Sequence, residues 1–475
     1  MMGTSHDLTR IAGIFEKQKA RSLALRTEKL AARKARLKSF GRFLHENKDR
    51  IAEAIYSDFK KPKAESAISE LYPVLTEIHH AVAHLDTWAK TQKVDAPLTY
   101  LGSRSEVRIE PKGVCLIVAP WNFPFNLCMG PLVSCLAAGN TAILKPSELT
   151  PHTSALIAAL VSEFFDEDLV TVVEGDQEAV KALMDLPFDH VFFTGSPAVG
   201  KIIMRGAAQN LASVTLELGG KSPTVIHETA NIEDAARRIA FGKFLNNGQT
   251  CIAPDYILVA PTIQDKFIAA LQAEVNRLFG VDGKITEASP HYARIVNQKH
   301  FDRLQKMLED ARQKNASFAL TGPSNRESNF MHPVIVTQVT ADMLIMQDEI
   351  FGPILPVLPF HSVAEVVQLI NVRPKPLALY VFGSSSAFRE KILAETSAGS
   401  VGINECITQF THPNLPFGGV NTSGIGKSHG RHGFMSFSNE KPVLKQKRGF
   451  AMPYLLHPPY SPSRKKMIDF MLRWL

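Results

Sequence analysis

Apolar and polar positions divide the chain into a helical N-terminal part and a longer part in which strands and helices alternate. Over residues 8–59, leucines recur every seven positions among arginines and lysines, which predicts long amphipathic helices packed on the body by one face. The pattern stops at the Lys-Lys-Pro of residues 60–62, which disfavours a coiled coil. A further helical stretch is predicted over residues 64–90, and residues 105–110 alternate as an exposed strand does.

After Pro111, short apolar runs alternate with helical patterns. Residues 114–118 are apolar at every position, as in a strand buried on both faces. Further strands are predicted over residues 141–145, 170–174, 190–194, 223–226, 256–260, 334–336 and 379–382. Repeated alternation of strand and helix is the signature of a parallel α/β sheet. The sequence therefore predicts two α/β regions, the second beginning after Ser213.

The composition is that of a globular protein, because 45% of the 475 residues are hydrophobic and 21% are charged. At about 100–200 residues per domain, this length predicts more than one domain. The net charge of +7 allows attraction to anions but is small for this length. No nucleic-acid motif accompanies the charge, so no nucleic-acid partner is expected.

The five cysteines are sparse and form no CxxC pair, which predicts a reducing compartment and no metal site. Four of them are expected in the core or its walls: Cys115, Cys128, Cys135 and Cys406. The N-terminus lacks the apolar core of a signal peptide, and no apolar run reaches the length of about 18 residues that a transmembrane helix needs. A cytoplasmic location is therefore expected.

Cys251 is the most informative residue in the chain. It ends the stretch Asn-Gly-Gln-Thr-Cys, in which a glycine and small polar residues lead into the thiol. A cysteine acts as a nucleophile when its thiolate is favoured and reachable, whereas most free cysteines are small buried hydrophobes. The segment alone leaves both interpretations open, and other segments must supply the partners of a nucleophile.

Two segments have the features of a nucleotide-binding edge. Residues 192–201 predict a strand, a tight turn at Gly195 and a helix that Ser196 can cap, with Gly200 allowing close packing of that helix. The exposed N–H groups at such a helix start favour an anion such as pyrophosphate. Lys145 directly follows an apolar strand, at the end where α/β sheets bind ligands, and could bind ribose hydroxyls or phosphate. An ordinary turn and a solvated lysine are the alternatives.

Three further segments carry polar groups suited to catalysis or binding. Two prolines fix the loop around Asn122, whose amide is a good oxyanion donor. Glu217 lies between two leucines, which could raise its pKa and suit it to act as a general base. Glu349 could accept ribose hydroxyls, and Phe351 could pack on a planar ring. Each of these positions, taken alone, is equally compatible with a turn or an exposed surface.

Together these segments resemble the NAD(P)-dependent aldehyde dehydrogenase superfamily. The stretches PWNFP, KPSE, FTGSxxxG, LELGGK, GQTC and EIFGP all occur, in the family's order and spacing, and the resemblance runs from about residue 10 to residue 440. The form GQTCIAPDY is similar to the class 3 branch. The resemblance implies a Rossmann-type cofactor domain, an α/β catalytic domain and a small β oligomerisation arm, in a homodimer.

The resemblance also implies a reaction. The Cys251 thiolate attacks the aldehyde carbon, the Asn122 amide and the Cys251 backbone N–H hold the oxyanion, and Glu217 activates the water that hydrolyses the thioester. Overall resemblance favours an aromatic substrate such as coniferyl aldehyde, with medium- or long-chain fatty aldehydes as the alternative. A non-catalytic structural protein on this fold is disfavoured because all three residues are intact.

For the cofactor, the resemblance implies that Lys145 and Glu349 hold ribose hydroxyls and that Phe351 packs near the nicotinamide. Residues 195–200 would line the pyrophosphate. Glu148 would lie close to a 2′-phosphate, which disfavours NADP by charge, so NAD is expected first with some use of NADP.

The implied domains are the NAD(P)-binding domain (1–95 and 111–213), the catalytic domain (214–405), the oligomerisation arm (96–110 and 406–442) and a C-terminal tail (443–475). The tail ends in a short basic amphipathic helix that includes Trp474. Packing of this helix on the protein is favoured over weak peripheral contact with an acidic membrane.

Overall fold

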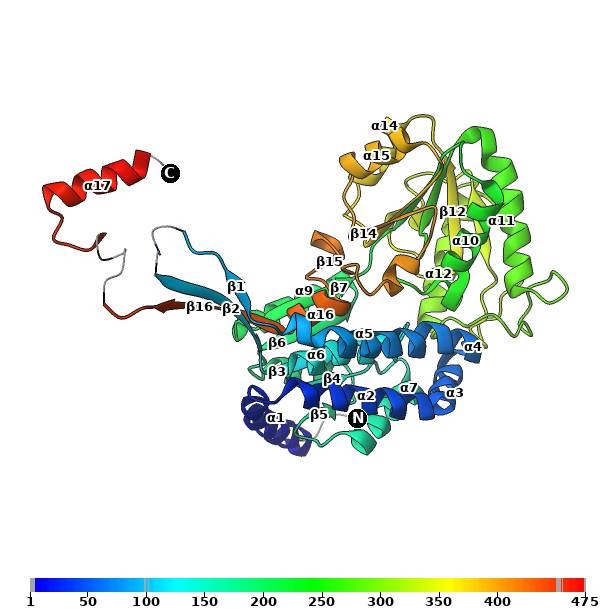
Figure 1. Ribbon diagram of the computed structural model, residues 1–475. Coiled ribbons are helices and arrows are strands. Elements are labelled where there is room, and N and C mark those ends of the chain that lie inside the picture. Colours follow the sequence, from blue (N-terminus) through cyan, green and yellow to red (C-terminus); the bar gives the residue numbers. More distant parts are fainter. Residues whose placement is uncertain (1–4, 98–99, 101, 450–453, 455, 474–475) are drawn as a thin grey trace.

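The computed structural model describes residues 5–97, 100, 102–449, 454 and 456–473, and its strands form sheets of six, seven and three strands. Figure 1 shows the two larger sheets as separate α/β bodies, with the three-stranded sheet projecting from the body that contains the N-terminus. The predicted α/β fold class is confirmed. None of the described helices is long and apolar enough to cross a bilayer.

The N-terminal part is helical, as predicted. Leu37 and Leu44 are buried in the core of the first body, but Leu23 is 63% exposed, so the leucine stripe is buried only in part. Lys60 has a left-handed backbone conformation (φ 53°) and ends the third helix just before Pro62. The elements are α1 (Ser5–Leu25), α2 (Leu30–Glu46), α3 (Lys48–Phe59), α4 (Lys63–Ser66), the π-helical turn η1 (Ala67–Leu71) and α5 (Tyr72–Trp88).

The six-stranded sheet has the order β15-β7-β6-β3-β4-β5, and only β15 is antiparallel to its neighbour. In its central strand, Leu116 and Ile117 pack into different core clusters, so both faces are buried as the apolar run predicts. The strands are β3 (Val114–Val118), β4 (Thr141–Lys145), β5 (Val170–Val172), β6 (His190–Gly195), β7 (Ser213–Leu218) and β15 (Gly424–Ile425). The helices are α6 (Asn126–Ala138), α7 (Pro151–Phe164), α8 (Gln177–Met184) and α9 (Pro197–Gln209).

The seven-stranded sheet has the order β10-β11-β12-β9-β8-β13-β14 and is parallel except for β10. Its strands are β8 (Pro223–Ile226), β9 (Tyr256–Val259), β10 (Ser317–Leu320), β11 (Val334–Thr337), β12 (Ile354–Pro359), β13 (Ala378–Phe382) and β14 (Ser400–Ile403). Its helices are α10 (Ile232–Phe244), α11 (Gln264–Phe279), α12 (Gln298–Gln313), α13 (Leu344–Gln347), α14 (Val363–Asn371) and α15 (Ser386–Glu395).

The predicted boundary after residue 213 is wrong at the level of the sheets. Strand β7 begins at Ser213 and pairs with β6, so residues 213–218 belong to the first sheet. The chain passes to the second sheet between Leu218 and Pro223, at the two glycines of that segment. Because β7 pairs with β6, Glu217 belongs to the first body and lies near the end of β7.

The three-stranded sheet consists of β1 (Gln92–Val94), β2 (Ser103–Pro111) and β16 (Ser438–Gln446), all antiparallel. The arm predicted over residues 96–110 and 406–442 differs from this sheet in both directions: β1 lies before residue 96 and β16 runs past residue 442, whereas most of residues 406–437 lie outside the sheet. Strand β15 joins the six-stranded sheet, and α16 (Gly430–Ser436) packs on α5 and α6. Helix α17 (Pro462–Arg473) lies apart from both bodies, beyond the arm (Figure 1), and Trp474 of the predicted tail helix lies outside the described residues.

Candidate active site

Cys251 follows a tight turn, η3 (Leu245–Gly248), that leads out of α10. Asn246 and Asn247 have left-handed backbone conformations (φ 52° and 56°), and Gly248 continues them at 73°. Such conformations are costly for residues other than glycine and persist only where the surroundings hold them. The Gln249 side chain holds this turn, because its amide donates to the Asn246 carbonyl at 2.9 Å and bonds the backbone of a facing loop.

The surroundings of Cys251 disfavour its thiolate form. The side chain is half-buried, and burial raises the pKa of the thiol well above its ordinary range. The negative charges of Glu349 and Glu217 raise this pKa further, whereas the backbone N–H groups of Cys251 and Ile252 lower it. Both predicted acidic site residues therefore act electrostatically on the sulfur, and attack by Cys251 requires removal of its proton.

Asn122 lies in the loop after β3 and is buried against the turn that carries Cys251. Its side-chain Nδ2 donates to the backbone carbonyl of Gln249 at 3.0 Å, and the backbone carbonyl of Asn122 accepts from Asn246 Nδ2 at 2.7 Å. An amide nitrogen carries two hydrogens, and the bond to Gln249 uses one of them. The structure thus brings the predicted oxyanion donor next to the predicted nucleophile.

Glu217 lies near the end of β7 and is fully enclosed. Burial raises the pKa of its carboxyl group, and the nearby His429 and a hydrogen bond from the Ser428 hydroxyl oppose that rise. The carboxylate lines a small cavity that it shares with His429 and Glu77 and with apolar walls from Leu127, Pro131 and Phe410. A buried carboxylate with a raised pKa is suited to take a proton near neutral pH.

Ser428 and His429 are site residues that the sequence analysis missed. They reach Glu217 because β15 pairs with β7, where Gly424 lies opposite Glu217. His429 Nδ1 is 2.7 Å from the Glu77 carboxylate on α5. Burial alone would lower the pKa of His429, but the hydrogen bond and the charge of Glu77 raise it above its ordinary value. No local sequence signal marks these positions, since their partners lie hundreds of residues away.

The predicted cofactor residues gather at the carboxyl-terminal edge of the six-stranded sheet. Lys145 ends β4, is 3% exposed, and its Nζ lies 2.9 Å from the carboxylate of Glu148, which is 41% exposed. Gly195 ends β6, and the Ser196 hydroxyl accepts from the Val199 N–H at the start of α9. The first turn of α9 is largely exposed, but Pro197 has no N–H group and the N–H groups of Val199 and Gly200 already donate to Ser196, so the Ala198 N–H is the group of this turn that an anion could use.

Gly200 explains how close α9 comes to its sheet. A Cβ at this position would lie 2.7 Å from the side chain of Leu218, so a larger residue would push the helix away. The close packing predicted for Gly200 is therefore present, and it keeps the start of α9 near the end of β7.

Glu349 and Phe351 lie at the edge of the second body that faces this site. Burial raises the pKa of Glu349 to about 8, and Asp255 raises it as well. Phe351 has a left-handed backbone (φ 47°) and packs edge-on against Trp121, in the same loop as Asn122, with ring centroids 5.2 Å apart. The segment is held by Arg303, a residue without a sequence signal, which donates to the Ile350 carbonyl at 2.6 Å.

These groups fit a dinucleotide. The Lys145 ammonium is almost buried and has three N–H donors, of which Glu148 takes one, so it can also donate to a hydroxyl or phosphate. The exposed helix start beyond Gly195 suits a pyrophosphate. The Glu349 carboxylate, which accepts from the Gly220 N–H, is an acceptor on the opposite side of the same site.

The comparisons with known proteins agree with one another. The model of the aldehyde dehydrogenase family matches residues 6–443. The chain is 44% identical over 418 residues to the 4,4′-diaponeurosporen-aldehyde dehydrogenase of Staphylococcus aureus, covering 88% of this chain and 90% of the relative. It is 39% identical to the human aldehyde dehydrogenase family 3 member B1, covering 93% of each chain. It is 38% identical to a probable coniferyl aldehyde dehydrogenase of Pseudomonas aeruginosa, covering 98% of this chain and 97% of the relative.

Solved structures lead to the same assignment. The substrate-bound state of Staphylococcus aureus AldH superposes with a TM-score of 0.92 at 41% identity, covering 97% of this chain and 99% of that one. An indole-3-acetaldehyde dehydrogenase from Pseudomonas syringae, in complex with NAD+, superposes with a TM-score of 0.85 at 25% identity, covering 93% and 89% of the two chains. The chain accordingly belongs to the aldehyde dehydrogenase family, whose members oxidise aldehydes, and its relatives include class 3 members of that family.

Proposed function

We propose that this protein oxidises an apolar aldehyde to the carboxylic acid with NAD(P)+, through a covalent intermediate on Cys251. The observation that carries the proposal is the surroundings of Cys251: a half-buried thiol on a constrained turn, the Asn122 amide beside that turn and the raised-pKa carboxylate of Glu217 acting on the sulfur. A nucleophile, an oxyanion donor and a base in one place support acyl chemistry.

In the proposed reaction, the Cys251 thiol gives its proton to solvent water, and its sulfur forms a bond to the aldehyde carbon as the C=O π bond breaks. The resulting oxyanion accepts hydrogen bonds from the second N–H of the Asn122 amide and from the Cys251 backbone N–H. NAD(P)+, when bound, supplies the acceptor for the hydride that converts this thiohemiacetal to a thioester. Glu217 then takes a proton from water, whose oxygen attacks the thioester carbon, and the C–S bond breaks to release the acid and the Cys251 thiolate.

For the cofactor, we propose that Lys145 and Glu349 hold ribose hydroxyls and that the start of α9, from Gly195 to Gly200, holds the pyrophosphate. Phe351 would border the nicotinamide. The Glu148 carboxylate disfavours a 2′-phosphate by charge, which supports NAD as the preferred cofactor with some use of NADP.

Two substrate classes follow from the comparisons. The relative named as a probable coniferyl aldehyde dehydrogenase supports the aromatic aldehyde that the sequence analysis favours. The more similar relative named for 4,4′-diaponeurosporen-aldehyde supports a long apolar aldehyde. The two classes share an apolar chain or ring next to the carbonyl carbon.

The test is the initial rate of NAD+ reduction by the purified protein, with coniferyl aldehyde and a long-chain alkanal measured side by side. We expect reduction with at least one of them and none in Cys251→Ala. The faster substrate identifies the class. Absence of NADH with both, with the Cys251 thiol titrated as reduced, would refute the proposed reaction.

We also propose a cytoplasmic homodimer in which the arm and tail pack on the partner subunit. Both outer strands of the three-stranded sheet, β1 and β16, are edges, and exposed edges favour pairing.

Helix α17 exposes Phe470 and Leu472 at 62% and 67%. Deletion of residues 448–475 should weaken the dimer in analytical ultracentrifugation. Sedimentation with anionic liposomes that is lost on this deletion would instead indicate membrane contact by the tail.

A further inference from the structure

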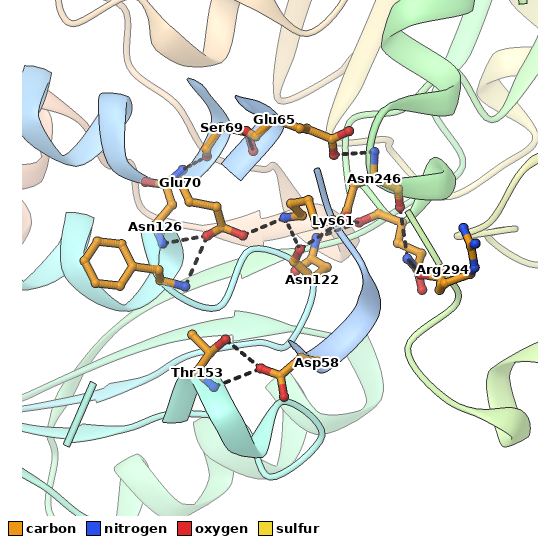
Figure 2. A network of polar contacts seen from close by, with 12 residues as sticks. Asp58, Lys61, Glu65, Ser69, Glu70, Asn122, Asn126, Thr153, Asn246 and Arg294 are labelled. Atoms are coloured by element: carbon orange, nitrogen blue, oxygen red, sulfur yellow. Dashed lines mark hydrogen bonds and ion pairs between the residues drawn. The ribbon is translucent and has the colours of Figure 1, made fainter. Parts of the chain in front are cut away.

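A buried ion pair lies beneath the loop that carries Asn122, outside the groups used in the proposed reaction. Lys61 and Glu70 are both fully enclosed, and Lys61 Nζ is 2.6 Å from Glu70 Oε1 (Figure 2). Lys61 comes from the short link between α3 and α4, and Glu70 comes from η1. Because burying two charges is costly, such a pair contributes little net stability. Its contacts suggest what it does instead.

The pair holds the loop at Asn122 itself and at the point where the loop enters α6. Lys61 Nζ also donates to the Asn122 carbonyl at 3.2 Å. The second oxygen of Glu70 accepts from the backbone N–H groups of Phe125 and Asn126, at 3.1 and 3.0 Å, where α6 begins. One ammonium and one carboxylate therefore fix the backbone at Asn122 and three to four residues after it.

The backbone carbonyl of Asn122 also connects its loop to η3, the turn that precedes Cys251. It accepts from Asn246 Nδ2 in addition to Lys61, so it receives hydrogen bonds from both bodies (Figure 2). The Asn246 backbone N–H donates to the buried Glu65 at 2.9 Å. The N-terminal helical part thus holds both the loop of Asn122 and the turn that precedes Cys251.

We propose that Lys61 and Glu70 are positioning residues, which place the Asn122 side-chain amide relative to Cys251. The inference rests on the proposed function of Asn122 as oxyanion donor. The amide reaches the Gln249 carbonyl only while the Asn122 backbone stays fixed, and the two N–H groups of this amide must point in set directions. Oxyanion donors act over about 2.7–3.1 Å, so a small displacement of the loop weakens the hydrogen bond that forms during attack.

The experiment is a double-mutant cycle on kcat/KM for the aldehyde. Lys61→Met/Glu70→Gln removes both charges together, so no uncompensated charge is left buried, and the introduced glutamine amide keeps an oxygen for the backbone N–H groups. The change is made in the wild-type protein and in Asn122→Ala, whose backbone carbonyl still receives the Lys61 bond. We expect a loss of about tenfold in the wild-type background, a fraction of the roughly 10²–10³ that a lost oxyanion donor costs, and less than about twofold in Asn122→Ala.

A matched control comes from the C-terminal end of α6, the helix whose start is bound by Glu70. Arg33 is buried and donates to the Ala138 carbonyl at 2.9 Å, at the end of α6, far along the helix from Asn122. Arg33→Met should lower kcat/KM by the same factor in both backgrounds, because it has no special link to the amide. The KM for NAD+ should stay unchanged in the Lys61/Glu70 variant, which distinguishes loop displacement from general loosening.

An equal loss in both backgrounds for Lys61→Met/Glu70→Gln would overturn the inference. If the double variant fails to fold, as judged by circular dichroism, Lys61→Met alone completes the same cycle with the same criteria, because Glu70 keeps the N–H groups of Phe125 and Asn126 as partners. An inactive wild-type protein, or an Asn122→Ala variant as active as the wild type, would overturn the proposed function itself. These outcomes are measured before the cycle, so the two failures are distinguishable.

Discussion

The Ser428 hydroxyl donates a hydrogen bond to the Glu217 carboxylate, although 211 residues separate the two along the chain. The pairing of β15 with β7 brings them together, since Gly424 lies opposite Glu217 and the chain then turns back over the carboxylate. His429, the next residue, binds Glu77. The predicted base is thus surrounded by groups that adjust its pKa, and each can be tested.

Ser428→Ala should make Glu217 a weaker acid. A hydrogen bond to the ionised form lowers the pKa of Glu217, so its removal raises that pKa and moves the acidic limb of the kcat profile to higher pH. We expect kcat at pH 7 to fall by roughly three- to tenfold, which corresponds to the roughly 0.5–1.5 kcal/mol of a typical hydrogen bond. Ser162→Ala, on the exposed side of α7, is the control. An unshifted limb would show that Ser428 does not tune the base.

Glu217→Gln should separate the two halves of the reaction. Glutamine cannot take a proton from water, so kcat should fall by about 10²–10⁴. Stopped-flow absorbance should still show a burst of NADH close to one equivalent per active site. Because burial raises the pKa of Glu217, the wild-type kcat should fall with decreasing pH sooner than an ordinary glutamate would cause. Loss of the burst itself would place Glu217 in the first half, and the exposed Glu233→Gln should change neither quantity.

The Glu77–His429 pair should stabilise the fold in a limited pH window. The pKa of His429 is raised, so its contribution is complete below the ordinary histidine value of 6.5 and is lost as pH rises through the folded-state pKa. The pKa of Glu77, which burial would raise, is lowered by His429, so its contribution is lost as pH falls through that lowered value. Glu77→Gln should therefore cost on the order of 1–3 kcal/mol near pH 6 and less at pH 9. Thermal unfolding of both proteins across this range measures the difference, and a constant difference would contradict the assignment.

Glu148→Gln should shift cofactor choice toward NADP. Removing a carboxylate from the expected position of the 2′-phosphate relieves about 1 kcal/mol of repulsion, so the ratio of kcat/KM for NADP+ to that for NAD+ should rise about fivefold. Glu178→Gln is a matched control, because Glu178 also pairs with a lysine three residues away but lies on α8. A ratio that stays constant would place the 2′-hydroxyl elsewhere.

Local patterns predicted the alternation of strands and helices well. The run of residues 114–118 is apolar at every position and forms a strand buried on both faces. The sheet boundary was misplaced because the pairing of β7 with β6 depends on a neighbour and not on the residues of β7 alone. The arm boundaries were misplaced for the same reason, since β15 and α16 pack on the first body.

The residues of the site fall into the same two groups, those marked by a local sequence pattern and those placed only by tertiary contacts. Cys251, Glu217 and Asn122 stand in short stretches whose residue order carries their chemistry, so they are visible in the sequence. Lys61, Glu70, Ser428 and His429 have no such stretches, and their importance comes from what folding places beside them. Hydrogen bonds and burial act over a few ångströms in space, and distance along the chain does not report that separation. The order of residues therefore indicates the proposed reacting groups, whereas the packing of distant segments sets their positions and shifts their pKa values.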